Sequence, residues 1–333
     1  MYRITGLLLM LAVSLLFAAG NRLEAEGPSA EVVFEVPSEQ VRLRAIGPLR
    51  GLSATMRRAL DPVSSVFEPI SAPAAGDWLA AHTERGQTFR QFVRSRPNRP
   101  DGRRNTIYLL PLGEFEPEKS PDLEDLKVCA AAFFGREVRL LPALSFENHQ
   151  LTSRINDSTG RRQYLTSDIL GLLQRQLPRD AYCTLAVTME DLYPQESWNF
   201  VFGQASLRNR VGVFSFARYD PSYERSEPAP GDRQTLLRRS CRVLVHETSH
   251  MFGMQHCIYF NCVMNGANHL QEFDARPMFL CPVCLRKLAW STGDDVKERY
   301  ERLQAAYQEI GLPDEAAWLA DRLEQLGVSG TER

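Results

Sequence analysis

The alternation of apolar and polar positions becomes regular from Asn105 onward. Residues 107–110 form a short apolar run, which is typical of a buried strand, and Val138 to Leu141 repeats this pattern. Between the two runs, residues 123–134 place apolar side chains three and four positions apart, which is typical of a helix. The pattern therefore predicts a strand, a helix and a second strand in this part of the chain.

Strands and helices continue to alternate further along the chain. The predicted elements are, in order, a helix over 166–177, strands over 183–187, 200–202 and 211–216, and a helix over 232–252. Two last helical segments, 294–310 and 314–326, are separated by Gly311-Leu312-Pro313 and predict a helical hairpin. This alternation indicates an α/β fold with a mixed sheet.

The N-terminal part of the chain has a different pattern. Arg3 precedes an apolar run from Ile4 to Phe17 that ends in small residues, so residues 1–20 are predicted to be a secretory signal peptide. The alternative is an uncleaved membrane anchor formed by residues 4–19. Residues 21–104 contain many Pro, Ser, Arg and Glu with little periodicity, which predicts an extension with a few short helices.

These patterns divide the chain into four parts. They are a signal peptide over 1–20, an N-terminal extension over 21–104, a main domain over 105–292 and a C-terminal hairpin over 293–333. Hydrophobic residues make up 44% of the chain and charged residues 24%, which is enough apolar material for a core. The formal net charge of -2 gives no indication of a nucleic-acid partner.

The strongest chemical signal is the segment from His246 to His256, which reads HETSHMFGMQH. A spacing of four places His246 and His250 one turn apart on the same helix face, so that both imidazoles can reach one ion. Gly253 can adopt positive φ, which would end the helix and turn the chain back so that His256 becomes the third ligand. A surface helix with incidental histidines is the alternative, but three of the six histidines fall in this one stretch.

The residue types in this segment suit hydrolysis by zinc. Three neutral imidazoles leave the ion its double charge and an open position for water. Glu247, beside the ligands, could accept a proton from that water and later deliver it to the leaving amine. The segment therefore predicts a catalytic zinc with Glu247 as the general base.

Four of the seven cysteines follow at spacings typical of a second zinc site, namely Cys257, Cys262, Cys281 and Cys284. Four thiolates leave no open position, so this second zinc would be structural. Two disulfides are the alternative, because an exported protein can meet an oxidising compartment. The three other cysteines lie in apolar stretches and are expected to be buried: Cys129, Cys183 and Cys241.

Two further residues lie near these sites. Met264 could pack beneath the catalytic zinc or be an ordinary core methionine. His269 lies between the two cysteine pairs and is interpreted as a polar contact near the cleft.

The combined pattern, HExxHxxGxxHCxxxxCxM over residues 246–264 with CxxC at 281–284, resembles the archaemetzincin family. Asp77-Trp78-Leu79 and Gln87-Thr88-Phe89 are similar to the longer, animal-type members, and the resemblance covers about residues 70–292. It implies that His246, His250 and His256 hold the catalytic zinc, that Glu247 is the general base and that Met264 is the Met-turn residue.

The resemblance also implies a fold and an activity. We expect a metzincin-like α/β fold, in which a mixed twisted sheet packs on the active-site helix, with two zinc ions per chain. The implied activity is hydrolysis of peptide or protein substrates, with an aminopeptidase-like preference for short peptides in some family members. A substrate is expected to add in extended form to an edge strand at 211–216.

A noncatalytic, zinc-stabilised binding protein is the alternative function, in which the histidine site is only structural. Intact Glu247 argues against it. No membrane association is expected for the mature chain unless residues 4–19 remain as an anchor.

Overall fold

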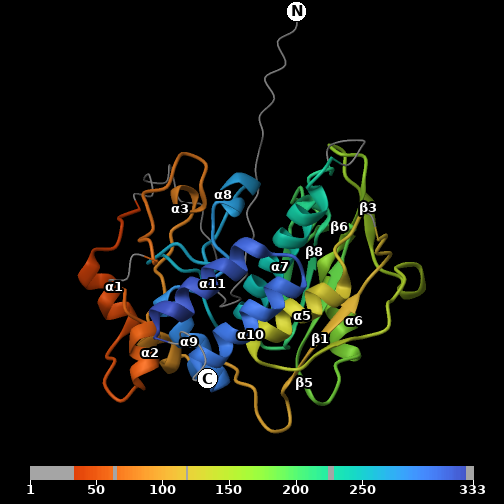
Figure 1. Cartoon of the computed structure of the whole chain (residues 1–333). Coiled ribbons are helices and arrows are strands. Elements are labelled where there is room, and N and C mark those ends of the chain that lie inside the picture. Colours follow the sequence, from red (N-terminus) through yellow and green to blue (C-terminus); the bar gives the residue numbers. More distant parts are fainter. Residues whose placement is uncertain (1–33, 63–65, 118, 224–228, 328–333) are drawn as a thin grey trace, which may run out of the picture.

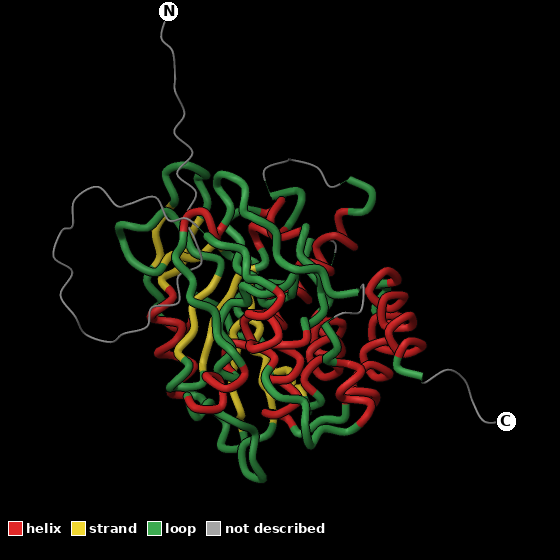
Figure 2. The backbone as a smooth tube through the Cα atoms, turned by 90° about the vertical axis from the view of Figure 1, so that its left-hand side faces the viewer, coloured by secondary structure: helices red, strands yellow, loops and turns green. Residues whose placement is uncertain are grey.

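The computed structural model describes residues 34–62, 66–117, 119–223 and 229–327 (Figure 1). The strands gather on one side of the molecule and most of the helices on the other (Figure 2). The predicted signal peptide and its alternative, the membrane anchor, lie outside the described residues. Among the helices that are described, none is long and apolar enough to cross a bilayer.

A mixed five-stranded sheet forms the centre of the fold, with the strand order β2-β1-β5-β8-β7. Its strands are β1 (Thr106–Pro111), β2 (Val138–Leu140), β5 (Ala181–Thr188), β7 (Gly203–Ser206) and β8 (Val211–Ser215). Only β7 is antiparallel to its neighbour, and all other pairs are parallel. The expected α/β class with a mixed sheet is therefore confirmed.

Successive residues of a strand point to opposite faces of the sheet, and in β1, β5 and β8 the residues on both faces are buried. Helices therefore cover both faces. Ile107 and Leu109 of β1 pack in the core that includes α5 (Leu123–Phe134) and α7 (Asp232–Met251). Leu110 faces the other way, toward α6 (Thr166–Arg175). The predicted helices at 123–134, 166–177 and 232–252 are thus found within two residues of their expected ends.

The edge strand differs from the one expected. β8 (211–215) lies between β5 and β7, so the strand expected at the edge is interior, and β7 forms the edge on this side of the sheet. The polar turn between these strands, where Arg210 has a φ of 59°, folds β7 back along β8. The expectation was wrong because the order of strands across a sheet depends on this return and not on apolar content.

The strand expected at 200–202 is also displaced. Only Val201 pairs, through a single bridge to Leu192, and the strand begins at Gly203. Just before this segment, the backbone carbonyl of Asn199 is bound by side chains and not by a neighbouring strand, because Gln163 and Asn156 both donate to it.

A second, smaller sheet of three strands was not predicted. It contains β3 (Ser153–Ile155), β4 (Arg162–Leu165) and β6 (Asp191–Tyr193), in the order β3-β4-β6. Two short 3-10 helices, η1 (Glu147–His149) and η2 (Ala217–Tyr219), lie in the loops. Arg218 of η2 makes two hydrogen bonds, of 2.8 and 2.7 Å, to the buried carboxylate of Asp191. This ion pair connects the small sheet to the chain that follows β8.

The described part of the N-terminal segment packs into the main core. It contains α1 (Glu39–Ile46), α2 (Ala54–Ala59), α3 (Trp78–Ala81) and α4 (Phe89–Arg94), shown in red and orange in Figure 1. α1 and α4 contact α9 (Pro282–Thr292). Ile46, Leu60 and Phe92 are almost fully buried in the same core as the sheet. This segment is therefore joined to the rest of the fold by extensive apolar packing.

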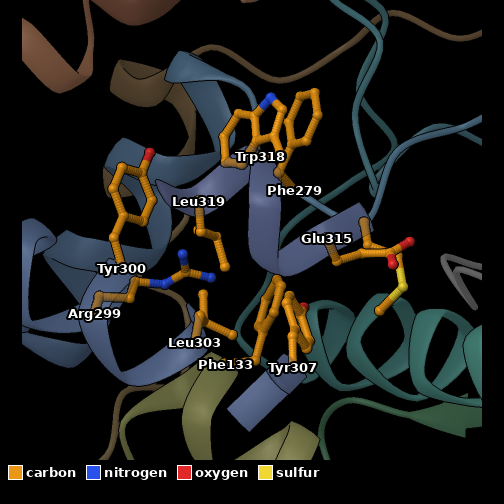
Figure 3. Close-up of a pocket in the computed structure, with 10 residues that line it drawn as sticks. Phe133, Phe279, Arg299, Tyr300, Leu303, Tyr307, Glu315, Trp318 and Leu319 are labelled. Atoms are coloured by element: carbon orange, nitrogen blue, oxygen red, sulfur yellow. The ribbon is translucent and has the colours of Figure 1, made fainter. Parts of the chain in front are cut away.

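The C-terminal hairpin consists of α10 (Val296–Glu309) and α11 (Pro313–Gln325), close to the two helices expected. α10 packs on α5 and α2. Figure 3 shows a pocket between α5, α10 and α11. It is lined by aromatic and aliphatic side chains together with Arg299 and Glu315. Its volume of about 20 Å³ suits a single water molecule, so it is not a peptide-binding cleft.

Candidate active site

The three histidines of the HETSHMFGMQH segment come together at the end of α7. His246 and His250 lie in the last two turns of the helix, and His256 follows the turn at Gly253. One ligand atom from each residue can be chosen so that all three lie within 4.8 Å of one another. All three side chains are buried.

Hydrogen bonds at the outer ring nitrogens determine which nitrogen faces the centre. His246 Nδ1 lies 2.7 Å from the carbonyl oxygen of Val263, and His250 Nδ1 lies 2.6 Å from that of Met254. A carbonyl can only accept, so each Nδ1 must carry the proton and donate it. Each neutral ring then has an unprotonated Nε2 with a lone pair directed away from its carbonyl partner.

Those lone pairs converge, which is unfavourable without a cation. Nε2 of His246 and Nε2 of His250 lie 3.1 Å apart. Two nitrogens bound to one tetrahedral zinc at 2.0–2.1 Å would be separated by about 3.3 Å. Burial lowers the pKa of His246, and it lowers that of His250 to about 3, so both rings are neutral as a metal requires. The residues present therefore fit a zinc ion.

Gly253 makes the turn to the third histidine possible. Its φ of 80° lies in the left-handed region, and a Cβ at this position would come within 2.6 Å of Pro97 Cβ. We expect Gly253→Ala to lower the free energy of unfolding by about 1–2 kcal/mol from backbone strain alone. It should also reduce zinc binding, because relief of the clash would move His256. Thermal unfolding and zinc content of the purified protein measure both effects.

Gly293→Ala is the matched control for this substitution. Gly293 also has positive φ, 75°, but nothing lies within 4 Å of its added Cβ. It should lose stability through strain and keep its zinc. Equal zinc content in the two variants would contradict a role for Gly253 in placing His256.

Glu247 lies beside the first histidine and is buried. Its burial raises the pKa of the carboxyl to about 7, close to neutral pH. A carboxyl in this state can exchange a proton with little free-energy cost near neutrality. The side chain therefore has the protonation behaviour that proton transfer requires.

The four cysteines of the second predicted site also come together. Cys257, Cys262, Cys281 and Cys284 are buried, with potential ligand atoms within 4.8 Å of one another. Cys257 Sγ and Cys281 Sγ lie 3.5 Å apart, near the distance of about 3.8 Å expected between two sulfurs on one zinc. All seven cysteines are described and none forms a disulfide. The structure therefore does not contain the alternative disulfides.

Sequence comparisons identify the relatives of this chain. The sequence model of Peptidase family M54 matches residues 161–290. The chain is 38% identical over 280 residues to archaemetzincin-2 of Rattus norvegicus, across 76% of this chain and 78% of that relative. It is 33% identical over 299 residues to archaemetzincin-1 of Homo sapiens, across 82% of this chain and 60% of that relative.

The chain belongs to the archaemetzincin family. By that membership it is a zinc metallopeptidase. Among solved structures, it is similar to archaemetzincin from Methanopyrus kandleri, with 28% identity, a TM-score of 0.44 and coverage of 59% of this chain and 99% of that chain. Archaemetzincin from Archaeoglobus fulgidus gives 31% identity, a TM-score of 0.40 and coverage of 55% and 99%.

Met264, the Met-turn residue implied by the archaemetzincin resemblance, is fully buried. Its carbonyl accepts a hydrogen bond of 2.8 Å from the backbone N–H of Cys257. The carbonyl of the preceding residue, Val263, is the acceptor for His246 Nδ1. The backbone of this turn therefore connects the histidine site to the cysteine site.

A third group of potential ligands lies near the archaemetzincin motif: Asp77, His269 and Glu272. His269 makes the polar contacts expected from the sequence, since its Nε2 lies 3.1 Å from Asp77 Oδ1 and its Nδ1 accepts from the N–H of Glu272. The carboxylate of Glu272 accepts from the backbone N–H groups of Trp78 and Asn268. These groups hydrogen-bond to one another and to nearby backbone N–H groups. The cluster therefore joins residues 77–78 to residues 268–272 and is not a vacant metal site.

Two polar side chains from the N-terminal segment, which were not selected from the sequence, contact the third histidine or the turn that precedes it. Glu84 Oε1 lies 2.8 Å from His256 Nδ1. Gln87 donates to the carbonyl of Gly253 and accepts from the N–H of Gln255. Gln87 belongs to the segment whose resemblance to animal-type archaemetzincins was noted from the sequence, which was a weak signal. Glu84 lies outside both quoted motifs and has no metal-ligand spacing, so nothing local distinguished it.

Proposed function

We propose that this chain hydrolyses peptide bonds at the site formed by His246, His250 and His256, with Glu247 as general base. The observation that carries the proposal is the convergence of unprotonated imidazole nitrogens at the end of α7, the helix that also carries the buried Glu247 carboxyl with its raised pKa. When bound there, zinc would supply a Lewis acid for the scissile carbonyl and for water.

The side chains of the site have separate roles in this mechanism. Glu247 accepts a proton as water attacks the carbonyl carbon, and the protonated carboxyl then donates that proton to the leaving amine. The carbonyls of Val263 and Met254 hold two of the imidazoles in the tautomer that leaves Nε2 free. A proton thus moves from water to the amine through one residue.

We propose that the substrate lies along β7, the edge strand next to β8. Gly212 of β8 pairs with Ala205 of β7 and lies against Met251, the residue after His250, so this side of the sheet is close to the end of the active-site helix. An extended peptide could pair with the free backbone groups of β7. Peptides with methylated backbone amides should then be cleaved more slowly than their unmodified counterparts.

A peptide library tests the activity. Purified protein should cleave some peptides, lose that cleavage after treatment with a zinc chelator and regain it when zinc is returned. Mass spectrometry of the products would distinguish removal of N-terminal residues, the aminopeptidase-like action implied by the family, from internal cleavage. Cleavage that survives complete removal of zinc would contradict the mechanism, and no cleavage with zinc bound would favour the noncatalytic binding protein.

We further propose that two zinc ions bind per chain, one at the histidines and one at the four cysteines. The support is the donor chemistry of the two buried clusters.

We also propose that residues 1–20 direct export and are removed. The support is Arg3 followed by the apolar run from Ile4 to Phe17. N-terminal sequencing of the mature protein would contradict this if it began at Met1.

A further inference from the structure

The three imidazoles of the histidine site do not have equivalent hydrogen-bond partners at Nδ1. His246 and His250 donate from Nδ1 to neutral backbone carbonyls. His256 instead has a carboxylate, Glu84, at 2.8 Å from its Nδ1. A carboxylate holds an imidazole proton more strongly than a carbonyl does, because the hydrogen bond is charge-assisted. His256 is therefore the ligand whose orientation depends most on a side chain.

Glu84 is itself held in one position. Trp78 Nε1 donates to the same oxygen, Oε1, at 2.9 Å. The indole ring meets the His256 ring edge to face, with centroids 5.0 Å apart, and it lies so close to Gly266 that an added Cβ would come within 2.6 Å of it. The backbone N–H of Trp78 is bound by the buried carboxylate of Glu272. Packing and hydrogen bonds thus restrict the Glu84 carboxylate to the position where it meets His256.

The third histidine needs such support because it lies beyond the end of α7. Helix geometry fixes the relative positions of His246 and His250, but the backbone hydrogen bonds that close the helix end at Met254, two residues before His256. Gln87 binds the backbone of this turn at Gly253 and Gln255. Residues 78–87 therefore hold both the backbone and the imidazole that supply the third ligand.

We propose that Glu84 is a positioning residue of the metal centre, which fixes the tautomer and orientation of His256 and so increases the zinc affinity of the histidine site. This inference rests on the proposed zinc site, and it assigns the N-terminal segment a role in metal binding. Glu84 touches neither substrate nor metal in this role. It acts through His256, as partners in the outer shell of a metal site do.

The test is zinc binding by the full chain carrying Glu84→Gln. An amide has the same shape and can still accept from Nδ1, so folding should be preserved while the charge is lost. Zinc per chain is measured in buffers of increasing free zinc, and a His250→Ala chain gives the baseline for the cysteine site. We expect the histidine site of Glu84→Gln to bind zinc about 10–100-fold more weakly than wild type. Glu84→Asp, which keeps the charge, should recover part of that loss.

Glu68→Gln is the matched control. Glu68 is an exposed residue of the same segment and accepts from the side chain of Asn261 at 3.1 Å, not from a metal ligand. This variant should bind zinc as wild type does. Unchanged zinc affinity in folded Glu84→Gln, or equal weakening in Glu68→Gln, would overturn the inference.

Thermal unfolding in the His250→Ala background, in which the histidine site is disrupted and the cysteine site keeps its zinc, separates a metal role from a merely structural one. If Glu84 acted only as a structural contact, adding Glu84→Gln to that background would lower the unfolding temperature, and Glu84→Gln in the otherwise wild-type chain would not weaken zinc binding at the histidine site. If instead zinc affinity depends on Glu84 but the loaded wild type cleaves no peptide, the proposed function fails and this inference stands.

Discussion

Glu247→Gln is expected to lower the rate of peptide cleavage by about 10³-fold, because an amide cannot accept the proton of the attacking water. Zinc content should stay at the wild-type level, since Glu247 is not one of the ligands. Burial raises the pKa of this carboxyl to about 7, so the fold disfavours the charged form. The neutral amide should therefore leave the free energy of unfolding unchanged or slightly higher. Steady-state cleavage of a peptide and metal analysis of the same sample measure the two effects.

Glu298→Gln, an exposed carboxylate on α10, is the control and should retain full activity. The result that would contradict the assignment is a Glu247→Gln protein that is loaded with zinc and cleaves at the wild-type rate. A noncatalytic binding protein would likewise lose no partner affinity on this substitution. The same variant therefore separates the two functions considered from the sequence.

Cys284→Ala is expected to have the largest effect on stability. Binding of a structural zinc contributes about 10–16 kcal/mol in isolated zinc-finger peptides, which is comparable to the total stability of a domain. Cys284 lies in the first turn of α9, where the helix N-terminus favours a thiolate. Its loss should release the zinc of the cysteine site and unfold the chain at a much lower temperature. Because Cys257 directly follows His256, we also expect weaker zinc binding at the histidines.

Cys183→Ala is the matched control, because Cys183 is equally buried but lies in β5. Burial raises the pKa of its thiol to about 12, so it is a neutral core side chain. Its removal should cost about 1 kcal/mol through a small cavity and release no metal. If the two variants unfold at the same temperature with the same zinc content, the four-cysteine zinc site is wrong. Sensitivity of the wild type to reductant but not to chelator would instead favour the disulfides.

The candidate sites could be located from the sequence because their spacings are local. His246 and His250 are one helical turn apart, so the period of the helix alone places them on one face. The turn at Gly253 needs a residue that tolerates positive φ, and the chain has a glycine at this point. The Cys281-x-x-Cys284 pair is likewise a short-range feature. In each case the residues that act together are separated by only a few positions.

Most helices and strands of the fold could be predicted from the sequence, but the order of the strands across the sheet could not. The main helices and most strands of the large sheet follow from apolar periodicity, because each buries a face that the period defines. Which strand forms the edge was predicted wrongly, since β7 covers β8 only after the chain reverses at Arg210. The small sheet was missed because its strands are only three or four residues long.

The sequence by itself thus predicted the candidate ligand sets, the zinc-peptidase family and the α/β class. The tertiary structure alone decided that β7 is the edge, that residues of the N-terminal segment enter the core, and that Glu84 meets His256. The physical reason is how far apart the interacting residues lie in the sequence. Helical and turn geometry fix contacts between near neighbours, whereas Glu84 and His256 are 172 positions apart and are brought together only by the packing of the whole core.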